Sequence, residues 1–359
     1  MTTPLKQVYT DAYLNDIGQR IQAVDPAFEH KRFVKAVFAE PWEALELKAR
    51  MRRITETLKQ FLPDDYDAAL ERLKPAAVYF SGYEAMFFPD FVGCYGVNEW
   101  QRSMVALNHF TRYSSSEFAV RPFIELDQER MLQQMLVWAG DENEHVRRLA
   151  SEGCRPRLPW ASTLPALKKD PTPVWSILET LKSDSSVYVR KSVANHLNDI
   201  SKDHPDLVVD RARQWLGHSK ETDWIVKHGC RTLLKARHPE VLQLFGVAGA
   251  DHISVTDGWV QDEVALGAEL TYGFTLCSEL GELGKVRVEL VMHFLRGRGQ
   301  YGQKVFKVFE GLVSDSKKKV ERSFSFKPLT TRRYYPGIQK LEIVVNGASL
   351  MAKEFLLVE

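Results

Sequence analysis

The sequence predicts a mostly α-helical solenoid of HEAT-like repeats followed by an all-β immunoglobulin-like sandwich. Apolar residues recur at helical spacing over about the first 245 residues. From about residue 128 a weak repeat of roughly 40 residues overlies that pattern, as in helical solenoids. After residue 245 the apolar residues alternate with period two. We therefore expect a HEAT-like repeat domain over 1–245 and an immunoglobulin-like domain over 246–359.

The composition is that of a globular protein. Of 359 residues, 44% are hydrophobic and 26% are charged, and the net charge is +1. The N-terminal residues are polar, and we find no run of about 18 apolar residues, so we predict a cytoplasmic protein without a membrane span. The four cysteines are far apart and form no C-x-x-C pair, which argues against zinc and disulfides. We expect a monomer.

The first helices are visible in the spacing of their apolar residues. Phe33, Val34, Val37 and Phe38 fall on one helical face, and a second such series runs from about residue 45 to residue 62. The Pro-Asp-Asp sequence at 63–65 is expected to end that helix and to cap the next one.

Internal similarity predicts the repeats. Val146, Val189 and Ile225 occupy equivalent positions, with spacings of 43 and 36 residues. Each lies near the start of a second helix that follows a polar cap, and two helices per roughly 40 residues is the period of HEAT-type arrays. The alternative is that these segments are only common helix starts. The first helices of the three pairs are expected over 131–138, 174–181 and 207–216.

Cations follow the aligned apolar position in each repeat. In a solenoid they would form a row along one side, suited to a phosphate backbone or to an acidic peptide. The row alone does not choose between these partners, and solvated surface charge is the plainer alternative. Its members are Arg147, Arg148, Arg190, Lys191 and Lys227.

The C-terminal part reads as about seven short strands, typical of an immunoglobulin-like sandwich. No Cys…Trp…Cys pattern is present, which excludes an antibody-type domain. The strands are expected over 253–255, 269–276, 285–294, 303–309, 322–326, 341–346 and 353–358.

Charge is unevenly distributed along this part. Residues 241–284 contain seven acids and no Lys or Arg, whereas residues 285–333 contain 13 Lys and Arg against four acids, a balance of +9. Such a block, interleaved with Gly and Tyr, favours nucleic-acid binding over a merely solvated face. The DNA contacts expected there are Arg296, Arg298, Lys317, Lys318, Lys319, Arg332 and Arg333.

Residues 151–160 carry the densest chemistry in the chain. They place one carboxylate, two guanidiniums, a Trp and two prolines directly after a predicted helix. Proline ends the helix and stiffens the loop that follows. The segment suits a site for phosphate together with a cationic or flat group. The alternative is a helix–helix connection with a half-buried Trp.

The segments 114–124, 151–160 and 187–201 together resemble the bacterial AlkC-type DNA alkylation-repair glycosylases, relatives of the AlkD-like HEAT-repeat enzymes. The resemblance extends to the immunoglobulin-like domain that a subset of this family has, and so covers nearly the whole chain. It implies hydrolysis of the N-glycosidic bond of cationic alkylated bases, chiefly N3-methyladenine and N3-methylcytosine, in double-stranded DNA. No metal or organic cofactor is implied.

The candidate catalytic groups are Glu117, Glu152 and Asp199, near helix ends in successive repeats. A cationic base leaves without protonation, so carboxylates would stabilise the positive charge developing on the sugar or direct water. Glu117 could instead belong to a capping box that begins at Ser114, and Asp199 could be a C-terminal turn residue. An acid at the position of Glu152 opposes the helix dipole, which favours a functional role.

Two aromatic residues and two more arginines complete the expected site. Trp160 and Trp175 are candidate planes for stacking on the lesion, although a Trp in such positions is often core. Arg155 and Arg157, with Arg190 and Lys191, would hold the flanking phosphates. Two alternatives to the enzyme stay open: a non-catalytic protein that binds damaged or bent DNA, and a protein-interaction scaffold.

Overall fold

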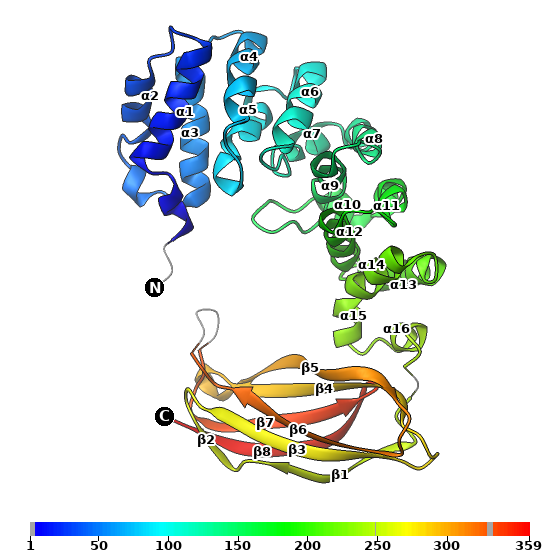
Figure 1. The fold of residues 1–359 in the computed structure, drawn as a ribbon. Helices are drawn as coiled ribbons and strands as arrows, with labels where there is room; N and C mark the ends of the chain where they lie inside the picture. The colour runs from blue at the N-terminus through cyan, green and yellow to red at the C-terminus, as the bar shows by residue number, and fades with distance from the viewer. Residues whose placement is uncertain (1–3, 248, 329–332) are drawn as a thin grey trace. The chain divides into compact units, whose positions relative to one another are not determined.

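The structure, a computed structural model, describes residues 4–247, 249–328 and 333–359 (Figure 1). The contacts within the chain divide it into two units, Met1–Gly229 and Cys230–Glu359. The first unit is helical and the second contains the strands, so the predicted order of helices followed by strands is confirmed. No helix among the described residues is both long and apolar enough to cross a bilayer.

The first unit is a succession of packed helices joined by turns and by a few longer loops (Figure 1). Its helices are α1 (Asp11–Val24), α2 (His30–Val37), α3 (Leu47–Phe61), α4 (Tyr66–Ala77), α5 (Phe87–Tyr95), α6 (Trp100–Thr111), α7 (Arg121–Leu126), α8 (Gln128–Trp138), α9 (Glu144–Glu152), α10 (Pro165–Lys169), α11 (Trp175–Leu181), α12 (Val187–Ile200), α13 (Pro205–Trp215) and α14 (Lys220–Gly229).

Side-chain caps fix where several of these helices begin. Asp65 accepts a hydrogen bond from the Ala68 amide at 2.8 Å, so the expected stop and cap at residues 63–65 are confirmed. Asn143 and Ser186 cap α9 and α12 in the same way. Each cap satisfies an amide that has no partner within its own helix.

The helix pairs α8–α9, α11–α12 and α13–α14 have the repeat arrangement that the sequence suggests. Helices α9, α12 and α14 pack on one another in turn. Arg147 donates to the carbonyls of residues 141 and 142, and Arg190 donates to those of residues 184 and 185. The same side chain therefore closes the same loop in two repeats, at offsets of six and five residues.

The second unit opens with two short helices, α15 (Arg231–Lys235) and α16 (Pro239–Leu244), which the sequence pattern groups with the solenoid. Its strands form two sheets, in the orders β1-β3-β6 and β2-β8-β7-β4-β5, and buried side chains from both sheets make one apolar core. The strands are β1 (Ile253–Val260), β2 (Glu263–Ala265), β3 (Glu269–Ser278), β4 (Gly284–Leu295), β5 (Tyr301–Val313), β6 (Lys317–Ser325), β7 (Gly337–Val345) and β8 (Ala348–Val358).

Strand register places the turns of this unit at two opposite ends. Gly284 pairs with Val313, so the β3–β4 and β5–β6 turns lie at one end. Leu295 pairs with Tyr301 at the other end, near the connection between β6 and β7. The nine residues of β6 span roughly 30 Å between the two ends.

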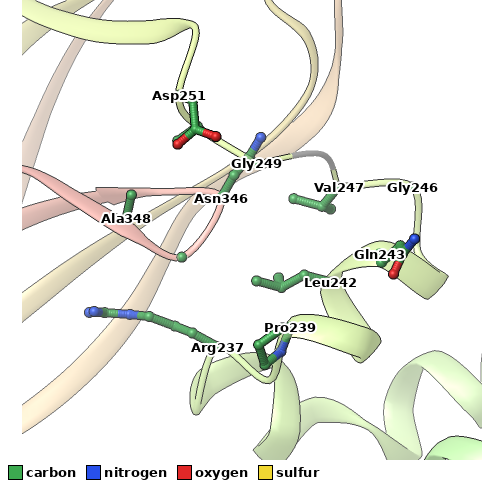
Figure 2. Close-up of a pocket in the computed structure, with 12 residues that line it drawn as sticks. Arg237, Pro239, Leu242, Gln243, Gly246, Val247, Gly249, Asp251, Asn346 and Ala348 are labelled. Carbon is green, nitrogen blue, oxygen red and sulfur yellow. The ribbon is translucent and has the colours of Figure 1, made fainter.

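A cavity of about 740 Å³ lies between α16 and the β7–β8 turn (Figure 2). Leu242 of α16 and Asn346 of the turn line it from opposite sides. Nearby, Lys285 of β4 donates a hydrogen bond to the Phe245 carbonyl. These contacts attach α16 to the sheets, which explains why it belongs to the second unit.

Candidate active site

The three candidate acids lie in one row that runs across neighbouring repeats. Glu117 is in the turn that precedes α7, Glu152 is the last residue of α9, and Asp199 is the penultimate residue of α12. Glu152 and Asp199 thus lie at helix ends, whereas Glu117 lies four residues before α7 begins at Arg121. Ser114 donates to the Gly82 carbonyl at 2.7 Å, and α7 begins only at Arg121, so the alternative capping box does not form.

Arg148 joins the first two acids. Its Nη1 donates to Glu117 Oε2 and to Ser115 Oγ, and its Nη2 lies 3.2 Å from Glu152 Oε1. Ser115 Oγ in turn donates to Glu117 Oε2 at 2.8 Å. One guanidinium therefore sets the relative position of two carboxylates from different segments of the chain.

Arg155 joins the second acid to the third. Its Nη1 donates to Glu152 Oε1 at 2.6 Å, and its Nε donates to Asp199 Oδ2 at 2.9 Å. Ser192 Oγ occupies the other Glu152 oxygen at 2.6 Å, and Lys202 Nζ is 3.1 Å from Asp199 Oδ1. The row thus alternates acid and base, and three carboxylates are balanced by three cations.

Burial and charge act in opposite directions on these arginines. Burial lowers the pKa of the Arg148 guanidinium, but the Glu152 and Glu117 carboxylates raise it by more, so its pKa lies above the ordinary value. Arg155 behaves alike, with Glu152 and Asp199 outweighing burial in raising its pKa. Both guanidiniums stay charged and keep the carboxylates in place.

Access to solvent differs along the row. The side chain of Glu117 is 15% exposed, that of Glu152 is 7% exposed and that of Asp199 is 3% exposed. The end of the row at Glu117 is therefore the one that water or a sugar can reach most easily.

Trp160 lies in the loop after α9 and is 60% exposed. Its φ of 65° is in the left-handed region, which costs a non-glycine residue roughly 1–2 kcal/mol. An exposed indole on a strained backbone is unusual for a core residue and fits a contact with a ligand. The alternative of a half-buried Trp does not describe this side chain.

Trp175 lies on α11, a helix that carries none of the three acids. It is the first residue of α11, the first helix of its pair, and Arg211 of α13 lies 4.8 Å above its ring. The structure does not bring Trp175 to the row of acids, and its ring already has a cationic partner.

Two other arginines expected at phosphates are bound to carboxylates as well. Arg147 makes two hydrogen bonds to Asp184, at 2.7 and 3.1 Å, and Arg157 makes two to Asp203, at 2.9 and 2.6 Å. Because these ion pairs join neighbouring repeats, they fix the stacking of the array. The exposed cations at the aligned helix starts are Lys191 and Lys227.

The described cations of the β-rich unit that were expected to contact DNA fall into two sets at opposite ends. Lys317, Lys318 and Lys319 open β6 at the end of the β5–β6 turn. Arg296 and Arg333 are exposed at the other end, in the β4–β5 and β6–β7 connections. Arg332 lies outside the described residues, as does the side chain of Arg298.

Sequence reasoning missed two exposed aromatic residues at the helix starts and two polar residues that bind the acids of the row. Tyr188 is 40% exposed, and Arg148 lies 5.0 Å above its ring. Trp224 is 39% exposed and stacks on His228. Both precede the aligned apolar position in their repeats, so the repeat alignment could have identified them. Ser192 and Lys202 carry no comparable signal.

Comparisons with known proteins agree with this architecture. Residues 113–233 match the family described as "DNA alkylation repair enzyme", and residues 256–359 match the C-terminal Ig-like domain of "Uncharacterised protein YhaZ". The chain is 47% identical over 345 residues to "Uncharacterized protein YhaZ" of Bacillus subtilis (strain 168), with 96% of each chain covered.

A solved structure is similar over the whole chain. It is that of the Pseudomonas fluorescens alkylpurine DNA glycosylase AlkC bound to DNA containing an abasic site analog, with 38% identity and a TM-score of 0.95, covering 99% of this chain and 100% of that one. Helical repeats followed by an Ig-like unit thus define a class of DNA alkylation-repair proteins. The chain belongs to its AlkC-type family, as the sequence resemblance indicated.

Proposed function

We propose that the protein is a DNA glycosylase that removes cationic alkylated bases, N3-methyladenine and N3-methylcytosine, from double-stranded DNA. The observation that carries the proposal is the row Glu117–Arg148–Glu152–Arg155–Asp199. The similarity to the Pseudomonas fluorescens glycosylase supports it. The products would be the free base and an abasic site.

The proposed reaction needs ionised carboxylates rather than a general acid that protonates the leaving base. A base alkylated on a ring nitrogen already carries a positive charge and leaves without protonation. As the bond breaks, positive charge develops on the deoxyribose, and carboxylates held close to it stabilise that state. The proposed reaction therefore needs no metal or organic cofactor.

The exposed fractions of the three acids suggest a different role for each of them. Glu117, the most exposed, would contact the sugar and direct the attacking water. Glu152 would stabilise the developing charge from behind it. Asp199 is nearly closed off from solvent and bound by Arg155 and Lys202, so its charge would act through Arg155. Asp199 is then a positioning residue in this scheme.

The cations of the row also reduce the electrostatic repulsion between the acids and DNA. Unpaired carboxylates would repel the phosphates that flank a lesion. Arg148, Arg155 and Lys202 balance the three acids, so DNA can come near without that penalty. The row presents negative charge locally to the sugar, while its total charge is close to zero.

Binding to the duplex is proposed to come from exposed cations. Lys191 and Lys227 of the helical unit, together with the cations of the Ig-like unit, would contact phosphates and carry no base information. The exposed indole of Trp160 would pack against the damaged nucleotide, where a cationic base gains a cation–π contact.

The test is release of free base from duplex DNA containing N3-methyladenine, measured under single turnover. The wild type, Glu152→Gln and the control Glu144→Gln, an exposed acid at the start of the same helix, are compared at saturating protein. We expect release by the wild type and the control, and a loss of about 10²–10³-fold in Glu152→Gln with DNA binding kept.

Two other outcomes have clear meanings. If the wild type binds DNA in a salt-dependent manner but releases no base, the protein is a damage- or shape-binding protein and the enzyme proposal fails. If Glu152→Gln releases base at the wild-type rate, the glycosylase stands, but the chemistry belongs to Glu117.

A further inference from the structure

The loop that carries Trp160, residues 153–162, is fixed at its base by one buried side chain. Arg121, the first residue of α7, is 3% exposed and donates to the carbonyls of Gly153 and Arg155 at 3.1 Å each. It also donates to the Ser162 carbonyl at the other end of the loop. Burial lowers the pKa of this guanidinium, and the three carbonyls are its compensation. Arg121 of α7 therefore binds both ends of the Trp160 loop.

The tip of the same loop is held from a distant part of the chain. Lys48 of α3 donates to the Trp160 carbonyl at 2.6 Å, across 112 residues of sequence. Its ammonium also lies 5.0 Å above the Phe118 ring, next to Glu117. Lys48 thus touches both the segment that bears the exposed indole and the residue that follows the most exposed acid of the row.

A cavity beside the loop makes the hydrogen bond from Lys48 important for the position of Trp160. A cavity of about 210 Å³ lies between α3, α5, α7 and the loop, and Lys48, Phe118, Arg121, Ala161 and Ser162 help to line it. Trp160 has a left-handed backbone, which is not the conformation a Trp residue adopts by itself. With room beneath the loop and a strained residue at its tip, an external contact is needed to keep the indole in one place.

We propose that Lys48 is a positioning residue for base excision: it holds the Trp160 carbonyl so that the indole meets the damaged nucleotide beside Glu117. The inference rests on the proposed function for its catalytic consequence, but its structural part stands by itself. It assigns a role to α3, which precedes the region 113–233 that matches the DNA alkylation repair family.

The structural part is tested by ¹⁹F NMR on protein labelled with 5-fluorotryptophan. The chain has eight Trp residues, so the Trp160 resonance is assigned by its absence in Trp160→Phe. We expect Lys48→Met to shift or broaden that resonance. The control is Lys59→Met, because Lys59 lies on the same helix and also donates to a backbone carbonyl, that of Asp64, at 3.1 Å. An unchanged Trp160 resonance in Lys48→Met would overturn the inference, whatever the activity.

The catalytic part is tested by a double-mutant cycle on single-turnover base release. We expect Lys48→Met to slow release about fivefold, the size of one cation–π contact, with the affinity for undamaged DNA and the thermal midpoint unchanged. In a Trp160→Ala background the same substitution should have no further effect, because its target is gone. Multiplicative losses in the double variant, or a loss equal to that in Lys59→Met, would contradict a role through Trp160.

Failure of the two proposals can be told apart. If the wild type releases no base, the glycosylase proposal fails, and the ¹⁹F experiment alone decides whether Lys48 positions the loop. If the wild type releases base and Lys48→Met does so equally fast, the glycosylase stands and Lys48 is not a positioning residue.

Discussion

Arg155 lies 2.6 Å from Glu152, so two groups that sequence analysis assigned to different partners are bound to each other. The guanidinium was expected on a phosphate and the carboxylate at the sugar. In the structure Arg155 also reaches Asp199 at 2.9 Å, and it is therefore the central link between α9 and α12.

That link predicts a large effect on stability. Arg155→Met leaves Glu152 and Asp199 buried and without their shared cation, and breaking such a pair costs about 3–5 kcal/mol. Urea unfolding should show a loss of that order. Arg157→Met is the matched control, because Arg157 is 33% exposed and its pair with Asp203 should contribute less than about 1 kcal/mol. Equal losses in the two variants would contradict a buried, essential link.

His196 predicts a dependence of stability on pH. It is fully buried, and burial together with the charge of Arg155 lowers its pKa to about 3. Since the unfolded chain takes up this proton near pH 6.5, the folded state loses stability as pH falls from about 6.5 towards 3, on the order of 3 kcal/mol by pH 4. The difference in unfolding free energy between the wild type and His196→Gln should shrink on acidification. A difference that is constant between pH 7 and pH 4 would refute the shift.

Trp160 predicts a preference for charged lesions. If the indole contributes a cation–π contact, Trp160→Ala should weaken binding to a cationic N3-methylated base about fivefold, or ~1 kcal/mol. Binding to a duplex with the neutral analogue 3-deaza-3-methyladenine should change much less. Trp175→Ala should leave the ratio of the two affinities unchanged, because its ring is beneath Arg211. An equal loss for both lesions in Trp160→Ala would mean contact without charge recognition.

The two ends of the Ig-like unit predict different salt dependences. Arg296 and Arg333 lie at the end that also has Tyr301, which is 42% exposed, whereas Lys319 is paired with Glu321 at 2.8 Å. We expect the double variant Arg296→Ser and Arg333→Ser to reduce the slope of log affinity against log salt by roughly one to two. Replacing Lys317, Lys318 and Lys319 by Ser should change it less. The reverse order would place the DNA at the other end.

Sequence periodicity sufficed for the helix pairs and for most of the strands, because both depend on local spacing. Asp65 caps its helix as expected for the same reason. Strand β2 was missed because it has three residues and a single buried side chain, Val264, too few to show alternation. It exists because it pairs with β8, more than 90 residues away in the chain.

The site was predicted less completely, because its contacts cross between repeats. The acids could be named from their residue type and motif, but Arg155 meets Asp199 across 44 residues and Lys48 meets Trp160 across 112. A sequence shows where a cation is but does not show which group it binds. Arg147 and Arg157 were therefore expected at phosphates, whereas in the structure each binds a carboxylate of the next repeat. The exposure of Trp160 likewise depends on a loop conformation that composition does not reveal.

The row of acids takes one member from the turn before α7, one from α9 and one from α12. No single repeat therefore contains all three acids. A solenoid can usually lengthen or shorten by whole repeats, but an insertion between residues 117 and 199 would part the acids by the height of a helix pair. Under the proposed function, this stretch of the array would therefore tolerate no change in the number of its repeats.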